Sequence, residues 1–397
     1  MAKIPIVDLK AQYQRIRSEV RKAIDEVLES QQFILGSQVE RFEQEVASYL
    51  GCRAAVGVAS GSDALLLSLM ALEIGAGDGV VVPPFTFVST VSAITRLDGT
   101  PTFVDIDPEN YLMSVEQLEA LLAERCHRGP GGEGVAERKS GCRIKAVVPV
   151  HLFGQVCPMA EIASLAADYR LRIVEDVAQA FGSHAALAQG AFKTAGTIGE
   201  LGCFSFFPTK NLGGLGDGGL VATDHVEIAD KIRVLRTHGE SSKYKHQAVG
   251  LNSRLDAIQA AVLRVKLRYI DQWCEERIQR AQLYRNLFLA TGLIENEVIR
   301  IPALASGRSH VFNYYVIRAQ RRDELKSFLA GQEIQTEIYY PLPLHLQPCF
   351  AHLGYRKGDF PNAELAATEV LALPLYPELT AEQQEIVVRK ISEFYRK

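Results

Sequence analysis

The sequence predicts an α/β protein with a large, mostly parallel sheet and a smaller α/β domain at its C-terminus. From about residue 53, apolar runs of strand length alternate with helical stretches. This alternation is typical of parallel strands with helices on both faces of the sheet. A second α/β pattern begins near residue 310. We therefore expect a large domain over residues 1–252, followed by a helical linker and the small domain over residues 253–397.

The individual elements follow in chain order. Amphipathic helices are expected at 14–29 and 38–50. The strand-length runs lie at 54–58, 80–82, 102–105, 145–150 and 171–175, and the helical stretches between them at 62–73, 88–97, 114–124 and 158–169. Residues 125–143 are rich in glycine and charge, which predicts an exposed loop. After a helical tract at 253–292, the small domain is expected as a strand at 310–319, a helix at 322–331, a strand at 334–340 and a helix at 379–396.

Composition excludes several classes of protein. A net charge of −4 gives no reason to expect binding to nucleic acid or to an anionic membrane surface. No window is apolar enough to span a bilayer, and the first residues lack the apolar core of a signal peptide. The seven cysteines are scattered, without a CxxC pair or a grouping with histidine. We therefore expect reduced thiols, no metal site and a cytoplasmic protein.

Residues 203–219 contain the most informative stretch, in which an aromatic run leads through Lys210 into five glycines. A lysine held between an apolar wall and a tight loop has little freedom, and burial disfavours its ammonium form. A neutral amine can attack a carbonyl and form an imine. The alternative is a surface turn that carries a lysine.

Three other strand ends supply complementary groups. Ser60, Gly61 and Ser62 precede a helix whose free amides could bind phosphate, or they are an ordinary helix cap. Phe87 could stack on a flat ligand, or it packs in the core. Asp176 ends an apolar strand and could pair with a protonated ring nitrogen, with Gln179 on the same side, or it is a turn residue.

Together these features are the parts that a pyridoxal phosphate (PLP) enzyme needs, namely a Schiff-base lysine, an acidic partner for the pyridinium, a phosphate cradle and a stacking ring. The glycines at 214–219 also fit G-x-G-x-x-G. A dinucleotide fingerprint should follow a strand and open a helix, whereas here an apolar strand follows. The sequence therefore disfavours a dinucleotide site.

At these residues the chain resembles the DegT/DnrJ/EryC1/StrS family, the sugar-nucleotide aminotransferases of the aspartate aminotransferase fold. The resemblance covers nearly the whole chain, including the motifs SGSDAL, PPFTFVST, VEDVAQAFGS, SFFPTKNLGGLGDGG and GLNSRLDAIQAA. The 125–143 stretch is the notable departure. The resemblance implies a PLP-dependent transaminase of amino-sugar biosynthesis.

The family resemblance also implies roles for single residues. Lys210 would hold the cofactor and move protons, Asp176 would pair with the pyridine nitrogen, and Gln179 would approach the ring hydroxyl. Phe87 would stack on the ring. Residues implied to bind the phosphate are Gly61, Ser62, Ser205 and, from the neighbouring subunit, Asn252. The last of these implies a homodimer with shared active sites.

The substrates implied are L-glutamate and a keto-sugar nucleotide, with a 3-keto sugar favoured over a 4-keto sugar by the KYKH and GLNSRLD stretches. Residues expected near the substrate are Arg254, Tyr339, Tyr340 and His345, with His238, Lys243, Tyr244 and His246 as further candidates that could equally be solvated. Arg254 could bind a carboxylate of glutamate or of a uronate sugar, or form an ion pair with Asp256. Two alternatives are a PLP-dependent sugar dehydratase, in which relatives replace the lysine by histidine, and a non-catalytic regulatory protein of the same fold.

Overall fold

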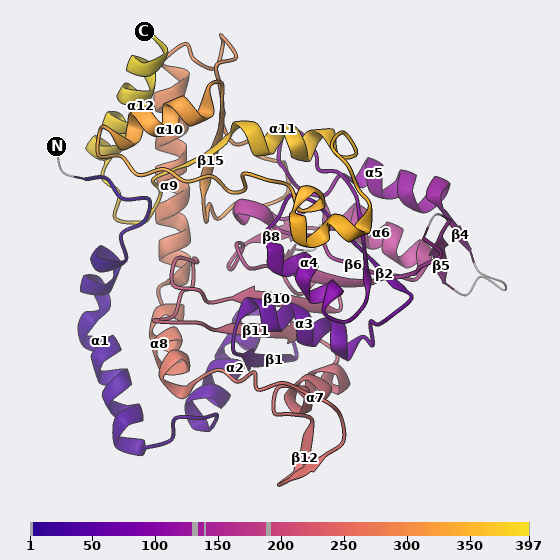
Figure 1. Cartoon of the computed structure of the whole chain (residues 1–397). Coiled ribbons are helices and arrows are strands. Elements are labelled where there is room, and N and C mark those ends of the chain that lie inside the picture. The colour runs from indigo at the N-terminus through magenta and orange to yellow at the C-terminus, as the bar shows by residue number, and fades with distance from the viewer. Residues whose placement is uncertain (1–2, 129–133, 139, 188–191, 397) are drawn as a thin grey trace.

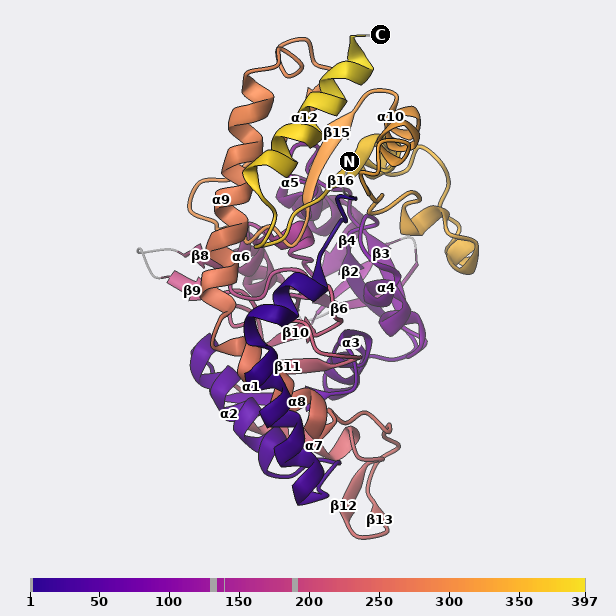
Figure 2. The same cartoon turned by 90° about the vertical axis from the view of Figure 1, so that its left-hand side faces the viewer.

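A computed structural model describes residues 3–128, 134–138, 140–187 and 192–396. Two helices, α1 (Leu9–Ser30) and α2 (Ser37–Leu50), precede a large sheet domain, and a smaller α/β unit lies at the C-terminal end of the chain (Figure 1). Helix α1 lies alongside α8 (Ala257–Leu267), far from it in sequence (Figure 2). None of the described helices is both long and apolar enough to cross a membrane.

The large sheet confirms the predicted α/β class. Its strands run in the order β1 (Ala54–Val58), β11 (Gly219–Thr223), β10 (Leu201–Ser205), β7 (Arg172–Asp176), β6 (Arg143–Val147), β2 (Asp78–Val82) and β3 (Thr100–Phe103). The pairs from β10 to β3 are parallel, whereas β11 is antiparallel to both of its neighbours. The expected helices are α3 (Gly61–Ala71), α4 (Val88–Thr95), α5 (Val115–Ala120) and α6 (Met159–Tyr169), followed after β11 by α7 (Val226–Leu235).

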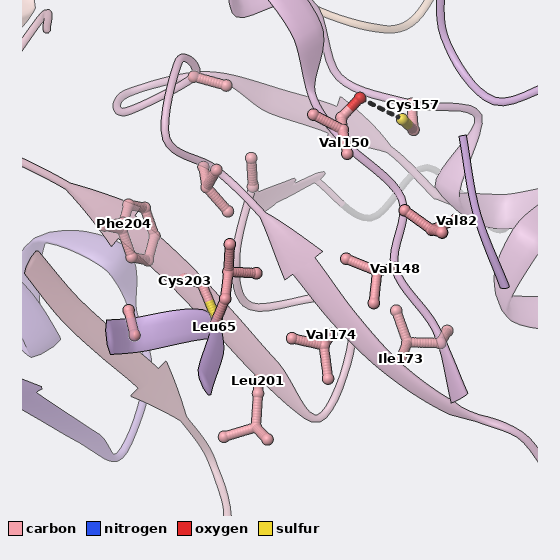
Figure 3. Close-up of a cluster of buried hydrophobic side chains, with 14 of the residues drawn as sticks. Leu65, Val82, Val148, Val150, Cys157, Ile173, Val174, Leu201, Cys203 and Phe204 are labelled. Carbon is pink, nitrogen blue, oxygen red and sulfur yellow. Dashed lines mark hydrogen bonds between the residues drawn. The ribbon is translucent and has the colours of Figure 1, made fainter. Parts of the chain in front are cut away.

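The core of this domain packs around the parallel strands. Leu65 of α3 lies among Leu201, Cys203 and Phe204 of β10 and Val174 of β7, all at most 3% exposed (Figure 3). Side chains of this kind each contribute roughly 1.5–3 kcal/mol when fully buried. Because α3 is apolar on nearly all sides, it is buried against the sheet, and its N-terminus is fixed at the sheet edge.

The small domain has its own core. An antiparallel sheet of β14 (Ile299–Arg300), β15 (Tyr315–Ala319) and β16 (Val370–Leu373) packs with the helices α9 (Ile270–Leu289), α10 (Arg322–Ala330), α11 (Pro361–Glu369) and α12 (Ala381–Tyr395). Ile4, near the N-terminus of the chain, is buried in the same core.

Two strands predicted in this domain differ from the structure, since one is shorter than expected and the other is absent. The strand predicted from residue 310 begins only at Tyr315, because the preceding residues bond to the large domain, where the Val311 N–H donates to the Gly154 carbonyl at 2.9 Å. Residues 334–340 form no strand and make only isolated bridges at Ile334 and Glu337. At the end of this segment, Tyr339 and Tyr340 turn towards the large domain, where Tyr340 bonds to Gln179.

The predicted loop at 125–143 is also wrong, since it contains strands β4 (Cys126–Arg128) and β5 (Val135–Glu137). This hairpin extends the large sheet through antiparallel pairing of β5 with β6. Cys126, Val135 and Glu137 are buried, and the Glu137 carboxylate accepts hydrogen bonds from Arg125 and Ser140. Residues 129–133 and 139 lie outside the described part of the chain.

Two further hairpins leave the body of the large domain. They are β8 (His184–Ala186) with β9 (Phe192–Thr194), and β12 (Glu240–Ser242) with β13 (Lys245–His246). The second hairpin projects from one end of the molecule (Figures 1 and 2). Two short 3-10 turns, Leu344–Leu346 and Pro348–Leu353, lie between α10 and α11 along the chain.

Candidate active site

A cavity of about 480 Å³ opens at the carboxyl ends of the central parallel strands, where ligands of open α/β sheets bind. Strand β7 ends at Asp176 and β10 at Ser205, and the N-terminus of α3 contributes Gly61 and Ser62. The small domain closes one side with Tyr314, Tyr339 and Tyr340. Nine expected site residues therefore line one cavity, namely the six just named (Gly61, Ser62, Asp176, Ser205, Tyr339 and Tyr340) together with Phe87, Gln179 and Lys210.

Asp176 is a buried carboxylate, 5% exposed, with one face directed into the cavity lining. Its Oδ2 accepts a hydrogen bond from Thr90 Oγ1 at 2.8 Å, and its Oδ1 accepts one from the Ala178 N–H at 3.1 Å. Burial raises the pKa of Asp176, while these hydrogen bonds and the more distant Lys210 oppose the rise. Among the described residues it forms no ion pair. A protonated ring nitrogen would supply the missing cation, so this site fits a pyridinium.

The neighbouring carboxylate, Glu175, has a structural role. Its oxygens accept hydrogen bonds from His151 Nε2 at 2.9 Å and from three backbone N–H groups of residues 196–199. His151 Nδ1 accepts from the Cys157 N–H at 3.0 Å, so the proton of the ring lies on Nε2. The backbone N–H of His151 in turn donates to the backbone carbonyl of Asp176 at 3.0 Å. This buried network holds the end of β7 in place.

The start of α3 forms the candidate phosphate cradle. Ser60 caps the helix, because its Oγ accepts the Asp63 N–H at 3.1 Å, and the cap leaves Gly61 and Ser62 in the cavity wall. A Cβ at Gly61 would lie 2.6 Å from Ser205 Cβ, so only glycine lets α3 approach β10 this closely. Ser62 Oγ and Ser89 Oγ are 2.6 Å apart. Free amides and hydroxyls meeting at a helix N-terminus suit a phosphate.

Lys210 lines the cavity but is only half-buried, so the expected enclosure by the aromatic run is incomplete. Phe206 is buried, whereas Phe207 is 51% exposed at the cavity wall. The loop is nevertheless tight, since the Lys210 N–H donates to the Phe207 carbonyl at 2.9 Å. The glycines that follow lead directly into β11 and not into a helix, which confirms that no dinucleotide fingerprint is present.

Gln179 is fixed from both ends of its amide. Its Oε1 accepts the Phe153 N–H at 2.7 Å, and its Nε2 donates to the Tyr340 hydroxyl at 3.1 Å. The Phe87 ring lies 6.1 Å from the Tyr340 ring and is 54% exposed, so one face is available to a flat ligand.

Sequence reasoning missed Tyr314 and Thr90. Tyr314 stacks on Tyr339 at 4.1 Å, and its ring centroid lies 6.0 Å from Lys210 Nζ. The position of Tyr314 next to the strand of the small domain gave no signal of this contact. Thr90 belongs to the PPFTFVST motif, and this motif was the available signal. The Thr90 side chain donates to Asp176 from the first turn of α4.

Several expected site residues, including the phosphate-binding candidate Asn252, do not line the cavity of their own chain. His345 is 1% exposed, with its Nε2 bonded to Glu364 at 3.0 Å and its ring against Phe360, and burial lowers its pKa. Asn252 is exposed and Arg254 partly exposed beside it, and Arg254 forms no ion pair with Asp256. The further candidates from His238 to His246 lie on or beside the β12–β13 hairpin, where Tyr244 is 84% exposed.

Comparison with known proteins places this geometry in context. The model of the DegT/DnrJ/EryC1/StrS aminotransferase family matches residues 14–392. The chain is 44% identical over 396 residues to a Geobacillus stearothermophilus protein named pleiotropic regulatory protein, covering 99% of both. It is 40% identical over 380 residues to the UDP-N-acetyl-3-dehydro-alpha-D-glucosamine 3-aminotransferase of Acidithiobacillus ferrooxidans, covering 96% of this chain and 95% of that protein.

Solved structures agree in fold over the same length. A DegT DnrJ EryC1 StrS aminotransferase from Brucella abortus superposes with a TM-score of 0.90 at 35% identity, covering 99% of this chain and 100% of that one. NtdA from Bacillus subtilis, with the cofactor PMP bound, has a TM-score of 0.86 at 28% identity and covers 100% of this chain and 86% of that one. The chain therefore belongs to the DegT/DnrJ/EryC1/StrS family of aminotransferases, enzymes that use pyridoxal phosphate.

Proposed function

We propose that the chain transfers an amino group from L-glutamate to the ketone of a nucleotide sugar, with PLP held in the cavity at the carboxyl edge of the large sheet. The bound cofactor supplies an electron sink for the electrons left when the substrate Cα proton departs. Lys210 attaches the cofactor through its Nζ and afterwards carries that proton. Asp176 keeps the ring nitrogen protonated, and Gly61, Ser62 and Ser205 hold the phosphate.

A single observation carries the proposal. A half-buried lysine, a buried carboxylate without a cation and a helix N-terminus open to an anion all line one cavity. Each feature alone has an ordinary structural explanation, but the three chemistries together match one cofactor. Gln179, fixed by Phe153 and Tyr340, would stand beside the ring hydroxyl, and Phe87 beside the ring face.

For the acceptor we favour a 3-keto sugar, since the similar Acidithiobacillus enzyme is named for a 3-dehydro sugar nucleotide. Tyr339 and Tyr340 line the cavity and would contact the sugar. His345 would act only indirectly, through the segment that it anchors to Glu364. A 4-keto sugar is the alternative acceptor.

The active site is proposed to be shared between two copies of the chain, with Asn252 of one copy reaching the phosphate of the other. Asn252 and Arg254 face outwards and do not line the cavity of their own chain. Phe33 and Ile34, which are 38% and 51% exposed, flank the same segment, because the Ala257 N–H donates to the Phe33 carbonyl and Ile34 bridges to Asp256. Exposed apolar side chains grouped in this way suit burial against a second copy.

Free thiols at the described cysteines fit a cytoplasmic site of action.

The test is to add L-glutamate to the PLP-loaded protein and follow the cofactor absorbance, then to add a panel of keto-sugar nucleotides and determine product masses. Conversion of the cofactor by glutamate and an aminated sugar product are expected. A product mass that shows loss of water would instead identify a dehydratase. An unchanged cofactor spectrum at saturating glutamate would support a regulatory protein, the role named for the Geobacillus relative.

A further inference from the structure

Residues 252–254 form an extended segment that is bonded to the start of α3. Along this extended segment Asn252 is exposed, Ser253 is 0% exposed and Arg254 is partly exposed. Alternate side chains of an extended segment point to opposite sides. Of the two outward residues, Asn252 is the one proposed to serve the partner subunit, whereas Ser253 points into its own chain.

Ser253 is bonded to the start of α3. Its Oγ donates to Asp63 Oδ2 at 2.7 Å and accepts the Ala59 N–H at 3.2 Å. Asp63 lies in the first turn of α3, and its own N–H is bonded to the capping Ser60. The Ser253 hydroxyl is thus bonded on both sides of Gly61 and Ser62, to the backbone N–H of Ala59 before them and to the side-chain carboxylate of Asp63 after them.

The backbone of the segment is equally well anchored. The Ser253 N–H donates to the Arg236 carbonyl at 2.9 Å. The Arg236 guanidinium, buried like its partner, binds Glu43 at 2.5 Å and the Gly57 carbonyl at 2.7 Å. Glu43 closes the network by accepting the Gly57 N–H at 2.8 Å. The segment is therefore held by strand β1 as well as by α3, and the Ser253 hydroxyl is the link between the segment and α3.

We propose that Ser253 is a positioning residue for two active sites at once, its own through Asp63 and the N-terminus of α3, and the partner's through the adjacent Asn252. The inference rests on the proposed shared site. A hydrogen bond to a carboxylate is among the stronger ones in proteins, so loss of the part-buried Ser253–Asp63 bond frees both the cradle and the neighbouring asparagine. One hydroxyl then sets phosphate affinity on both sides of the dimer interface.

Mixed dimers separate the two effects. In the first, one chain carries Lys210→Ala with Ser253→Ala and the other is otherwise unchanged, so the remaining lysine reports the effect of Ser253 in the partner. In the second, Lys210→Ala and Ser253→Ala are on different chains, so the lysine reports the effect within its own chain. Occupancy is measured by borohydride fixation of PLP to Lys210 and intact-mass analysis over a PLP titration, which needs no turnover.

The proposal expects the PLP concentration for half-labelling to rise about tenfold in both arrangements, and also with Ser253→Cys, which keeps the volume but bonds weakly. A rise in only one arrangement, or in neither, would overturn it. Ser392→Ala, which removes a 6% exposed hydroxyl bonded to the Val388 carbonyl in α12, is the control and should leave labelling unchanged. Asn252→Ala tested in the same two arrangements examines the shared site itself, since a defect confined to its own chain would refute that site independently of Ser253.

Discussion

Replacing Asp176 by asparagine should remove most of the activity and leave the fold intact. The side chain is 5% exposed, and its hydrogen bonds can be kept, because the amide oxygen can accept the Ala178 N–H and the amide nitrogen can donate to Thr90 Oγ1. We therefore expect the free energy of unfolding to change by no more than about 1 kcal/mol.

The loss of activity follows from the missing charge. Contact between a carboxylate and a cation shifts the pKa of each group by roughly 1–3 units in favour of its charged form, here the protonated ring nitrogen. Burial of the pair strengthens this effect. Two to three units correspond to about 3–4 kcal/mol, so kcat should fall by about 100- to 1,000-fold. Single-turnover reaction with glutamate, followed by the cofactor absorbance, measures this directly.

A second measurement separates charge from structure. Burial raises the pKa of Asp176 above its unfolded value, so in the absence of cofactor the folded state binds more protons than the unfolded state between the two values. Stability then falls as pH rises through that window, and the asparagine variant lacks this loss. The cofactor-free variant should therefore melt at or above the wild-type temperature at neutral pH, with a smaller increase on adding PLP. A variant that keeps a tenth or more of kcat, or that unfolds well below the wild type without cofactor, would refute the reasoning.

Three further predictions concern other residues of the site. Lys210→Ala should abolish transamination, because no other described amine lines the cavity, and turnover near that of the wild type would contradict this. Gly61→Ala should weaken PLP binding, since the added Cβ would meet Ser205 Cβ at 2.6 Å, whereas Gly75→Ala, with its nearest atom at 4.0 Å, is the matched control in the same titration. Arg254→Lys should raise the KM for glutamate or for a uronate sugar about tenfold with little change in melting temperature, because a point charge replaces a bidentate fork. Unchanged kinetics in both half-reactions, together with a lower melting temperature, would show that Arg254 has a structural role.

Much of the site could be predicted from sequence because its residues stand next to strand ends. Asp176 and Ser205 end apolar strands, and Gly61 opens the helix that follows another. In a parallel sheet, these positions converge at one edge whatever the details of packing. The same local logic predicted the alternation of strands and helices, which depends on periodicity within each segment.

Other features depended on contacts between residues far apart in the chain. Local composition could not show that Cys126, Val135 and Glu137 would be buried as a hairpin on the sheet edge, because their partner strand, β6, follows the glycine-rich stretch. The position of His345 likewise depends on its hydrogen bond to Glu364 and its ring contact with Phe360, and in this position it does not line the cavity. Tyr314 joins the site only because the small domain packs against the lysine loop.

Sequence alone therefore determined the α/β class and the meeting of Asp176, Ser205 and Gly61 at one edge of the sheet, because each of these features is encoded by the residues at the end of a single element. Tertiary structure alone decided which aromatic side chains close the cavity, which of two adjacent carboxylates is free for a cofactor, and that Ser253 ties the Asn252 segment to α3. In each of these cases the deciding interaction joins side chains from different elements, as when His151 and the 196–199 turn occupy Glu175 and leave Asp176 to the cavity.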